Sequence, residues 1–281
     1  MKTYKKEYYL FFQRFFNFNF RDEFHKKMEP VIELIDFKEP IDAQISVRDI
    51  KWSQDEITLR ELLREKLSSF GLIQKILVFN AEKAGLWYGY VNFYSPRVAS
   101  KVHDTFEHSP LEIESHPCKM NMSRNPHKNR KLMLHQCNDL ANYYLGFNGW
   151  SSEILYHQLE NSTESEQKYA TAVKLSFKDF KEHFVEGVGM SVAKFKNIEE
   201  KISEMRVVQK NSKSAALLNA FSKVIIVLVH VGDDKTKVSL EIDHSRTDPF
   251  HYNSIWDDDT ILDVQEVIGE EELSSLFEFE F

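Results

Sequence analysis

The 281 residues are 42% apolar and 13% aromatic, enough to bury the core of one large or two ordinary domains, and no stretch approaches the eighteen uncharged apolar residues of a membrane-spanning helix. Cys118 and Cys137 are too few for a disulfide framework, so a reducing compartment is expected. The net charge of -8 does not exclude a nucleic-acid partner, because residues 257–281 hold ten acidic and no basic residues and leave the preceding chain at about +2.

The first 43 residues form an aromatic-rich extension, with nine tyrosine and phenylalanine residues between Tyr4 and Phe20. The segment lacks the aliphatic centre of a secretory signal, and it carries Glu7, Asp22 and Glu23, which a transit peptide would lack. An amphipathic extension and an artefact of gene prediction are both compatible with this composition.

Residues 44–116 alternate between strand and helix patterns. Thr58 followed by Glu61 has the spacing of a capping box and predicts a helix that Gly71 ends, and Ser95-Pro96 predicts the start of a second helix. Runs of β-branched and aromatic residues predict four strands, at residues 45–50, 73–79, 87–94 and 111–115. The order βαββαβ predicts an α+β domain, ferredoxin-like, with a four-stranded antiparallel sheet and two helices on one face.

Residues 117–135 are expected to form a basic linker, because Pro126 and three asparagines disfavour regular structure. The linker has no acidic residue, and its basic residues are Lys119, Arg124, Lys128, Arg130 and Lys131. We predict that they neutralise phosphates, and a solvated charge run is the alternative.

Residues 136–245 predict a second α+β domain, and residues 246–281 an acidic C-terminal tail. The predicted elements are a helix at 138–145 ended by Gly146, a hairpin of 170–177 with 183–192, a helix at 210–221, and strands at 224–231 and 236–242. The tail is expected to be solvated. The alternatives are a nucleic-acid mimic that competes for the linker and a short amphipathic segment that docks on a partner.

The predicted third strand carries the clearest functional signal, because alternate residues of a strand share a face. Tyr88 and Tyr90 are therefore expected to lie together on the helix-free face, about 7 Å apart, as a platform on which successive unpaired bases stack. An ordinary aromatic-rich strand is the alternative. Arg48, on the first strand, is predicted to assist, because guanidinium planes also stack on bases.

These residues resemble the RNA-recognition motif, whose long signature is matched at Tyr88, Gly89, Tyr90, Val91 and Phe93. The sequence departs from the signature at Leu86 and Trp87, and Ser46 stands where the short signature of the first strand has an aromatic residue. One of the three stacking positions of the family is therefore missing.

A second resemblance is to the RAD52 single-strand-annealing family, carried by Leu140-Ala141-Asn142, Phe147-Asn148-Gly149-Trp150 and Glu186-Gly187-Val188-Gly189. The combined order of motifs looks like that of the RAD52 motif-containing family. The resemblance implies binding of DNA and RNA, a role in the DNA-damage response and homologous recombination, a nuclear location with a cytoplasmic fraction, and no catalysis. Asn148, Gly149 and Trp150 are expected to define the fold rather than to touch a ligand.

Three positions depart from the annealing family, where basic residues grip the phosphate backbone. This chain has Gln136, Leu218 and Asn219 at those places, so ring assembly and efficient annealing are not expected. Lys210, Lys213 and Lys223 are expected to make weaker contacts.

The sequence contains no phosphate loop, nucleophile elbow or paired zinc-protease histidines, so we expect no enzyme and no cofactor. Two histidine–cysteine pairs, His116 with Cys118 and His135 with Cys137, could together supply four zinc ligands, but their one-residue spacing is not a usual zinc pairing.

The predicted function is non-enzymatic binding of single-stranded DNA and RNA by an accessory factor in repair. Duplex DNA, a second copy of the chain and a recombination factor are further candidate partners, and no membrane partner is expected. The alternative is a protein-interaction adaptor that uses the sheet face and the acidic tail.

Overall fold

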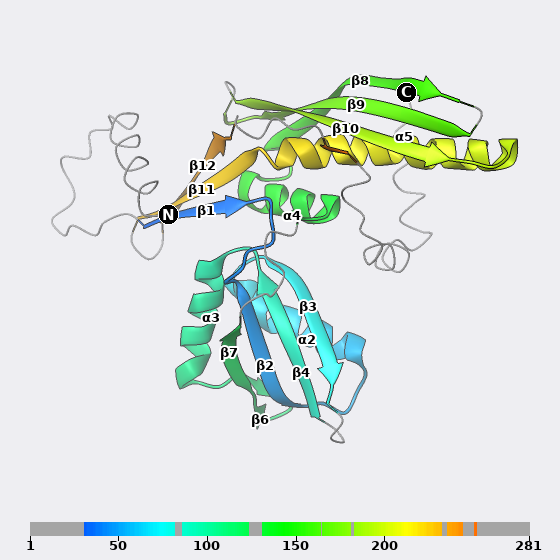
Figure 1. The fold of residues 1–281 in the computed structure, drawn as a ribbon. Coiled ribbons are helices and arrows are strands. Elements are labelled where there is room, and N and C mark those ends of the chain that lie inside the picture. The colour runs from blue at the N-terminus through cyan, green and yellow to red at the C-terminus, as the bar shows by residue number, and fades with distance from the viewer. Residues whose placement is uncertain are drawn as a thin grey trace, which may run out of the picture.

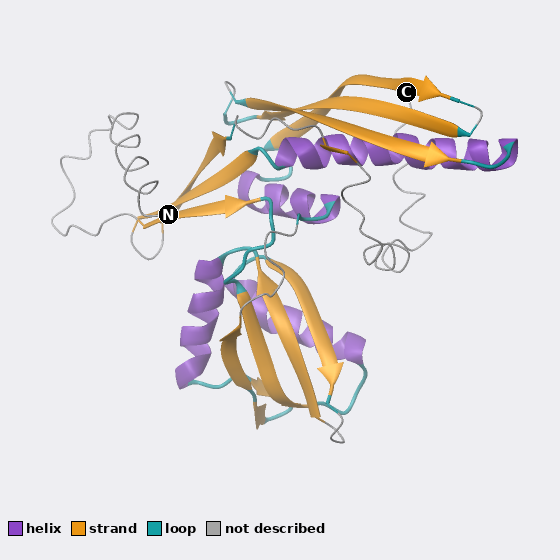
Figure 2. Ribbon diagram, in the orientation of Figure 1, coloured by secondary structure: helices purple, strands orange, loops and turns teal. Residues whose placement is uncertain are grey.

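The structure is a computed structural model that describes residues 31–81, 86–123, 131–163, 165–180, 183–231, 235–243 and 250–251. It is a mixed α and β protein whose sheets are mainly antiparallel (Figure 2). Within the described ranges, no helix has both the length and the apolarity needed to cross a membrane.

One four-stranded antiparallel sheet, here called the platform sheet, has the strand order β3-β4-β2-β7 (Figure 1). Its strands are β2 (Gln44–Lys51), β3 (Ile73–Asn80), β4 (Leu86–Phe93) and β7 (Lys119–Ser123). Helices α2 (Glu56–Leu67), followed by the 3-10 turn η1 (Ser68–Phe70), and α3 (Pro96–His108) pack on one face. Their apolar residues form one core with alternate strand residues, including Ile45, Val47, Val78, Val91, Phe93, Leu63 and Val102.

The two helix starts differ in how well the sequence predicted them. Ser95 caps α3 as expected, because its Oγ accepts a hydrogen bond from the Val98 amide at 3.1 Å and Pro96 follows it. The predicted capping box at Thr58 is wrong. The cap of α2 is Asp55, whose Oδ1 accepts from the Thr58 amide at 2.8 Å, so Thr58 is already inside the helix.

The predicted fourth strand at residues 111–115 is also wrong. Glu114 and Ser115 have φ angles of 47° and 62°, the left-handed pair that makes a tight two-residue turn. The chain therefore folds into a small hairpin of β5 (Glu112–Ile113) and β6 (His116–Pro117). The fourth strand is β7, which pairs antiparallel with β2, so Lys119 lies in the platform sheet and not in a linker.

A second sheet, here called the long sheet, has the order β13-β10-β9-β8. Its strands are β8 (Trp150–Ser162), β9 (Glu166–Phe177), β10 (Phe184–Lys194) and β13 (Phe250–His251). Helix α5 (Ile198–Phe221) lies across β9 and β10 (Figure 1). The predicted hairpin is β9 with β10, whereas β8 was not predicted and α5 begins well before residue 210.

Two glycines of β10 allow α5 to lie close to the sheet. A Cβ on Gly187 would come within 2.2 Å of the Ala216 carbonyl oxygen, and one on Gly189 within 2.1 Å of the Ala216 nitrogen. The spacing of the two glycines therefore reflects backbone contact with the helix rather than a turn or a phosphate loop.

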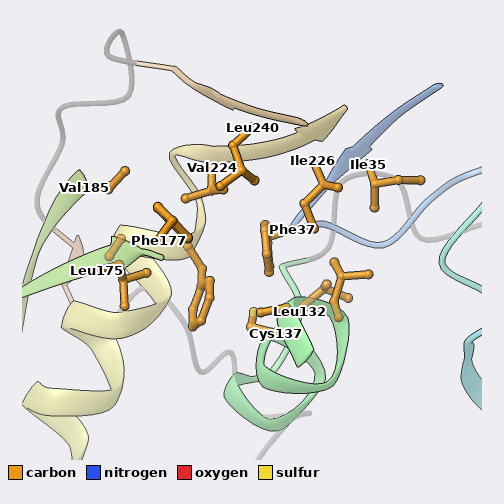
Figure 3. Close-up of a cluster of buried hydrophobic side chains, with 14 of the residues drawn as sticks. Ile35, Phe37, Leu132, Cys137, Leu175, Phe177, Val185, Val224, Ile226 and Leu240 are labelled. Carbon is orange, nitrogen blue, oxygen red and sulfur yellow. The ribbon is translucent and has the colours of Figure 1, made fainter. Parts of the chain in front are cut away.

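A third sheet pairs the first strand of the described chain with two strands from its last third, in the order β1-β11-β12. Its strands are β1 (Val31–Asp36), β11 (Val224–Val231) and β12 (Lys235–Ile242), and α4 (Leu134–Leu145) packs beside it. Residues from β1, α4, α5 and the long sheet share one core (Figure 3). Phe37, just after β1, stacks on Phe221 with 4.9 Å between ring centroids. Part of the predicted N-terminal extension is therefore a core strand.

Two hydrogen bonds connect the platform sheet to this second core. Tyr94, which follows β4, donates from its hydroxyl to the Gln136 carbonyl oxygen at 3.2 Å. Ser95 donates from its Oγ to Glu33 of β1 at 2.5 Å, and the other oxygen of Glu33 lies 3.2 Å from Nε2 of His230 on β11. The junction is thus held by polar contacts as well as by burial of the Tyr94 ring.

Candidate functional site

The helix-free face of the platform sheet carries the predicted stacking residues. Trp87, Val91 and Phe93 of β4 point toward α2 and α3, so the alternate residues Tyr88 and Tyr90 point to the opposite face. Tyr88 is 37% exposed and Tyr90 is half-buried. The two rings are therefore on the predicted face and partly open to solvent.

A third ring, which sequence reasoning missed, completes the cluster. Phe79 of β3 is the register partner of Tyr88 and is 41% exposed. Its ring stacks on that of Tyr88 with 5.3 Å between centroids and 25° between planes. No local pattern marks this ring in the sequence, because Ile76 and Val78 on the core face alternate with Leu77 and Phe79, which are apolar as well.

The two tyrosine rings are not parallel to each other. Tyr88 and Tyr90 have centroids 6.3 Å apart and planes at 88°, and Phe79 meets Tyr90 at 69°. One face of Tyr88 is occupied by Phe79. A planar ligand can therefore stack on the outer faces of this three-ring cluster, but not on both tyrosines in one plane.

Arg48 lies beside the cluster because of a bulge in β2. Val47 pairs with Gly89 and Ile50 with Trp87, so the two exposed residues between them, Arg48 and Asp49, stand opposite Tyr88 alone. Asp49 has a φ of 60°, which accommodates the extra residue. The bulge keeps Val47 and Ile50 in the core and leaves Arg48 exposed next to the rings.

Lys119 is the register partner of Arg48 on β7 and is strongly exposed. Its Nζ lies 2.8 Å from Oδ2 of Asp49, and the hydrogen bond and charge of Lys119 lower the pKa of that carboxyl. Arg48 and Lys119 thus place two cations at the rim of the aromatic cluster, one of them paired with an acid.

The side chains in the middle of the helix-free face are polar and buried. Ser46 is only 3% exposed and donates from its Oγ to the Asn121 carbonyl oxygen at 3.2 Å. One row further, Gln44 donates from Nε2 to Oδ1 of Asn92 at 2.9 Å, and both side chains are buried. Ser46 belongs to an internal hydrogen-bond network, which explains why this position does not carry the aromatic residue of the family signature.

Of the other predicted phosphate contacts of the linker, the structure describes only Lys131. Arg124, Lys128 and Arg130 lie outside the described residues. The backbones of Lys131 and Lys38 pair through a single antiparallel β-bridge. Lys131 also lines a small hollow with Leu132 and Cys137, against the second core. Burial, followed by the charge of Lys38, lowers the pKa of Lys131.

The three positions that replace the annealing family's basic residues have structural roles. Gln136 is buried in the first turn of α4, where its Oε1 accepts from the Met133 amide at 3.0 Å. Asn219 is buried on α5, and its Oδ1 accepts from the Val188 amide at 3.0 Å. Leu218 packs against the second core.

The residues of the RAD52-like segment have structural roles, in side-chain packing and in a turn of the backbone. Trp150 donates from Nε1 to Oδ1 of Asn142 at 2.9 Å and contacts the Phe221 ring with 5.3 Å between centroids. A Cβ on Gly149 would lie 1.8 Å from the Leu145 carbonyl oxygen. Asn148 and Trp150 also line a hollow of about 440 Å³ with Lys174, Lys178, His183 and Phe184.

The histidine–cysteine pairs do not converge on a metal position. Cys118 is part of the platform core and Cys137 part of the second core. Burial raises the pKa of Cys118 to about 11 and raises that of Cys137 further. Both are buried free thiols, which disfavours the thiolate form that zinc requires.

A family model described as the RDM1 DSRM domain matches residues 132–225, from the residues before α4 to the start of β11. RAD52 motif-containing protein 1 of Danio rerio is 30% identical over 243 residues, covering 77% of this chain and 84% of the relative. The chain belongs to the RAD52 motif-containing protein 1 family. The member from Gallus gallus is 29% identical over 241 residues, covering 77% of this chain and 82% of its own. The member from Homo sapiens is 26% identical over 226 residues, covering 71% and 78%.

Solved structures that match part of the chain contain RNA-recognition motifs. The RRM3 domain of Mip6 is 11% identical and covers 29% of this chain and 93% of that domain, with a TM-score of 0.25. The PID-3 TOFU-6 RRM domain complex is 20% identical and covers 31% of this chain and 90% of that chain, with a TM-score of 0.27.

Proposed function

We propose that this protein binds single-stranded DNA and RNA without catalysis, with the open face of the platform sheet as the primary contact. The residues in this role are Phe79, Tyr88 and Tyr90 as the stacking cluster, with Arg48 and Lys119 at its rim. The βαββαβ unit acts as an RNA-recognition-type domain, and the unit built from α4, β8–β10 and α5 is the second nucleic-acid-type domain. The observation that carries the proposal is the partly exposed three-ring cluster on the helix-free face.

The chemistry of the cluster suits unpaired bases. An exposed aromatic face binds any base by stacking, and each stack contributes about 1–3 kcal/mol. Arg48 and Lys119 stand as register partners beside the rings, where the phosphates of a stacked strand would pass. In a duplex the faces of the bases are covered by stacking on the neighbouring base pairs, so the cluster favours single strands over duplex DNA.

The RAD52-motif name of the relatives supports a cellular role in recombination repair. We infer an accessory factor of the DNA-damage response and recombination repair, nuclear with a cytoplasmic fraction. Gln136, Leu218 and Asn219 serve packing and backbone hydrogen bonds rather than phosphate contact, which is consistent with binding that does not drive annealing.

Fluorescence polarisation with labelled single-stranded DNA and RNA at two salt concentrations tests the proposal. The double variant Tyr88→Ala, Tyr90→Ala should weaken binding by roughly 2–4 kcal/mol while the protein stays folded. Tyr143→Ala is the matched control, because Tyr143 is an exposed tyrosine on α4, away from the platform sheet. Equal affinities of the double variant and the parent would remove the platform from the proposal.

A protein-interaction adaptor is the second candidate function. It is favoured by the buried polar middle of the face, where Gln44 donates to Asn92 on β4 and Ser46 donates to the backbone of β7. In that case the rings of Phe79 and Tyr88 would anchor an apolar side chain of a peptide or helix. Failure of all nucleic-acid titrations, together with retained fold, would favour this function.

A further inference from the structure

Strand β8 is a long unpaired edge of the long sheet. It has 13 residues and pairs with β9 on one side only, and among the described residues no strand lies beyond it (Figure 1). Natural edges are blunted by lysine, proline or short length, yet residues 150–162 contain no lysine, arginine or proline. Bulges near Leu155 and Glu160 leave a regular stretch, Tyr156–Leu159, between them.

The edge is apolar as well as unpaired. Ile154 is 52% exposed, and Leu155, Tyr156 and Leu159 are also exposed, so the strand presents both free backbone groups and uncovered apolar side chains. Helix α5 covers β9 and β10 but makes no comparable contact with β8. Such a surface is a template for an added strand.

The two faces of β8 differ in charge. The face toward α5 holds Ile154, His157 and Leu159, which pair with the buried Val173, Thr171 and Tyr169. The outer face holds Glu153 and Tyr156, and the Tyr156 hydroxyl donates to Glu160 at 2.6 Å. Acidic side chains of an added strand would therefore be repelled on the outer face.

Basic residues of α5 flank the inner face. Arg206, Lys210 and Lys213 are spaced by four and three residues, so they share one side of the helix. Burial and, to a smaller extent, the positive charge of Lys213 lower the pKa of His157 on β8. Lys213 therefore lies on the side of α5 that is nearer to β8. His157 is in turn tied to the helix through Thr171, whose Oγ1 lies 2.8 Å from both His157 Nδ1 and Ser212 Oγ.

One segment of this chain has the matching pattern. Residues 277–281 read Phe-Glu-Phe-Glu-Phe, which alternates at the period of a strand and would put three rings on one side and two carboxylates on the other. The segment has five residues and no lysine or arginine, and its length suits the regular stretch Tyr156–Leu159. Its pattern is thus complementary to an edge with basic groups on one face and an exposed tyrosine on the other.

The tail can reach this edge from its point of attachment. β13 ends at His251 and lies three strands away from β8 in the long sheet, a distance of about 15 Å at the usual strand spacing. The 25 residues between His251 and Phe277 span up to about 80 Å when extended.

We propose that residues 277–281 add as a strand to the free edge of β8, with Glu278 and Glu280 toward Arg206, Lys210 and Lys213 and the phenylalanine rings on the side of Tyr156. In this position the tail pairs with the free backbone groups of β8, covers the ring of Tyr156 and neutralises the basic side of α5. The contact is a property of the intact chain and does not depend on the platform sheet.

Hydrogen exchange of the full chain tests the proposal, read at the β8 amides that do not bond to β9. In the parent these amides should be protected, and Phe277→Ser, Phe279→Ser, Phe281→Ser should speed their exchange by about tenfold or more. The matched control is Val264→Ser, Val267→Ser, Ile268→Ser, which removes three apolar residues of the same tail and should leave β8 unchanged.

A charge exchange tests the orientation. Glu278→Lys, Glu280→Lys should also expose β8, and adding Lys213→Glu, Lys210→Glu to that variant should restore its protection. Fast exchange of β8 in the parent, or equal protection after the phenylalanine changes, would overturn the proposal. Protection that is lost on dilution would assign the edge to a second copy, and protection that needs added oligonucleotide would assign it to nucleic acid; either result overturns it as well.

Discussion

Phe79 and Tyr88 lie on neighbouring strands with their rings nearly parallel and 5.3 Å between centroids. The pair makes a wider aromatic surface than either ring alone, and Tyr90 closes one side of it edge-on. The binding surface therefore depends on a residue of β3 as much as on the two tyrosines of β4.

Phe79→Ala should weaken single-strand binding by about 1–3 kcal/mol, because it removes one stacking surface and the support of Tyr88. Polarisation titrations with a short oligonucleotide measure the change. Ile57→Ala, an exposed apolar residue of α2 on the helical side of the platform sheet, is the control and should leave affinity unchanged. An effect of Ile57→Ala equal to that of Phe79→Ala would mean that the loss is not specific to the helix-free face.

Asp49→Asn should strengthen binding and steepen its salt dependence by up to about one unit in the log–log slope, because it frees Lys119 from its ion pair. Lys119→Ala should reduce the slope by about one unit. Glu112→Gln removes one negative charge from the exposed β5 strand and serves as the control for net charge. Identical slopes for all three variants would exclude Lys119 as a phosphate contact.

Asn142→Ala should lower the free energy of unfolding by about 1–3 kcal/mol, because it leaves the partly buried Trp150 Nε1 without its acceptor. Urea denaturation followed by tryptophan fluorescence measures this. Asp139→Ala, exposed on the same helix, should change stability little. Full stability of Asn142→Ala would show that the Trp150–Asn142 hydrogen bond does not stabilise the fold.

Gly187→Ala should destabilise the protein by at least about 1–3 kcal/mol, because the added methyl group would meet the Ala216 oxygen at 2.2 Å and force α5 away from β10. Val188→Ala, on the opposite face of the same strand, is the comparison and should cost less. The midpoints of chemical denaturation rank the two. A more stable Gly187→Ala than Val188→Ala would contradict the close approach.

Both tyrosines, the order of elements around them and the start of α3 could be predicted, because they depend on local periodicity and on Ser95 as a cap. The fourth strand could not, since the left-handed pair Glu114 and Ser115 redirects the chain and neither residue is a glycine that would have marked the turn. Phe79 was missed because its neighbours in β3 are apolar on both faces, and no local pattern separates a core face from an exposed aromatic one.

Local sequence patterns could not predict the pairing of β1 either, for a different reason. Val31–Asp36 precede the platform sheet by only a few residues but pair with β11, nearly 200 residues later in the chain, and only the folded core brings them together. The same long separation applies to β8, whose exposed residues follow neither strict alternation nor a buried run.

β1 precedes the platform unit in the chain and α4 follows it, and both belong to the second core. The platform unit is therefore an insertion between two elements of that core. Two chain crossings, together with the Tyr94 and Ser95 contacts, limit how far the aromatic face can swing. A fragment that begins at Ala43 would keep the aromatic rings of the platform sheet but would lack β1, the strand that pairs with β11. Truncation at the apparent start of the first domain would therefore destabilise the last one.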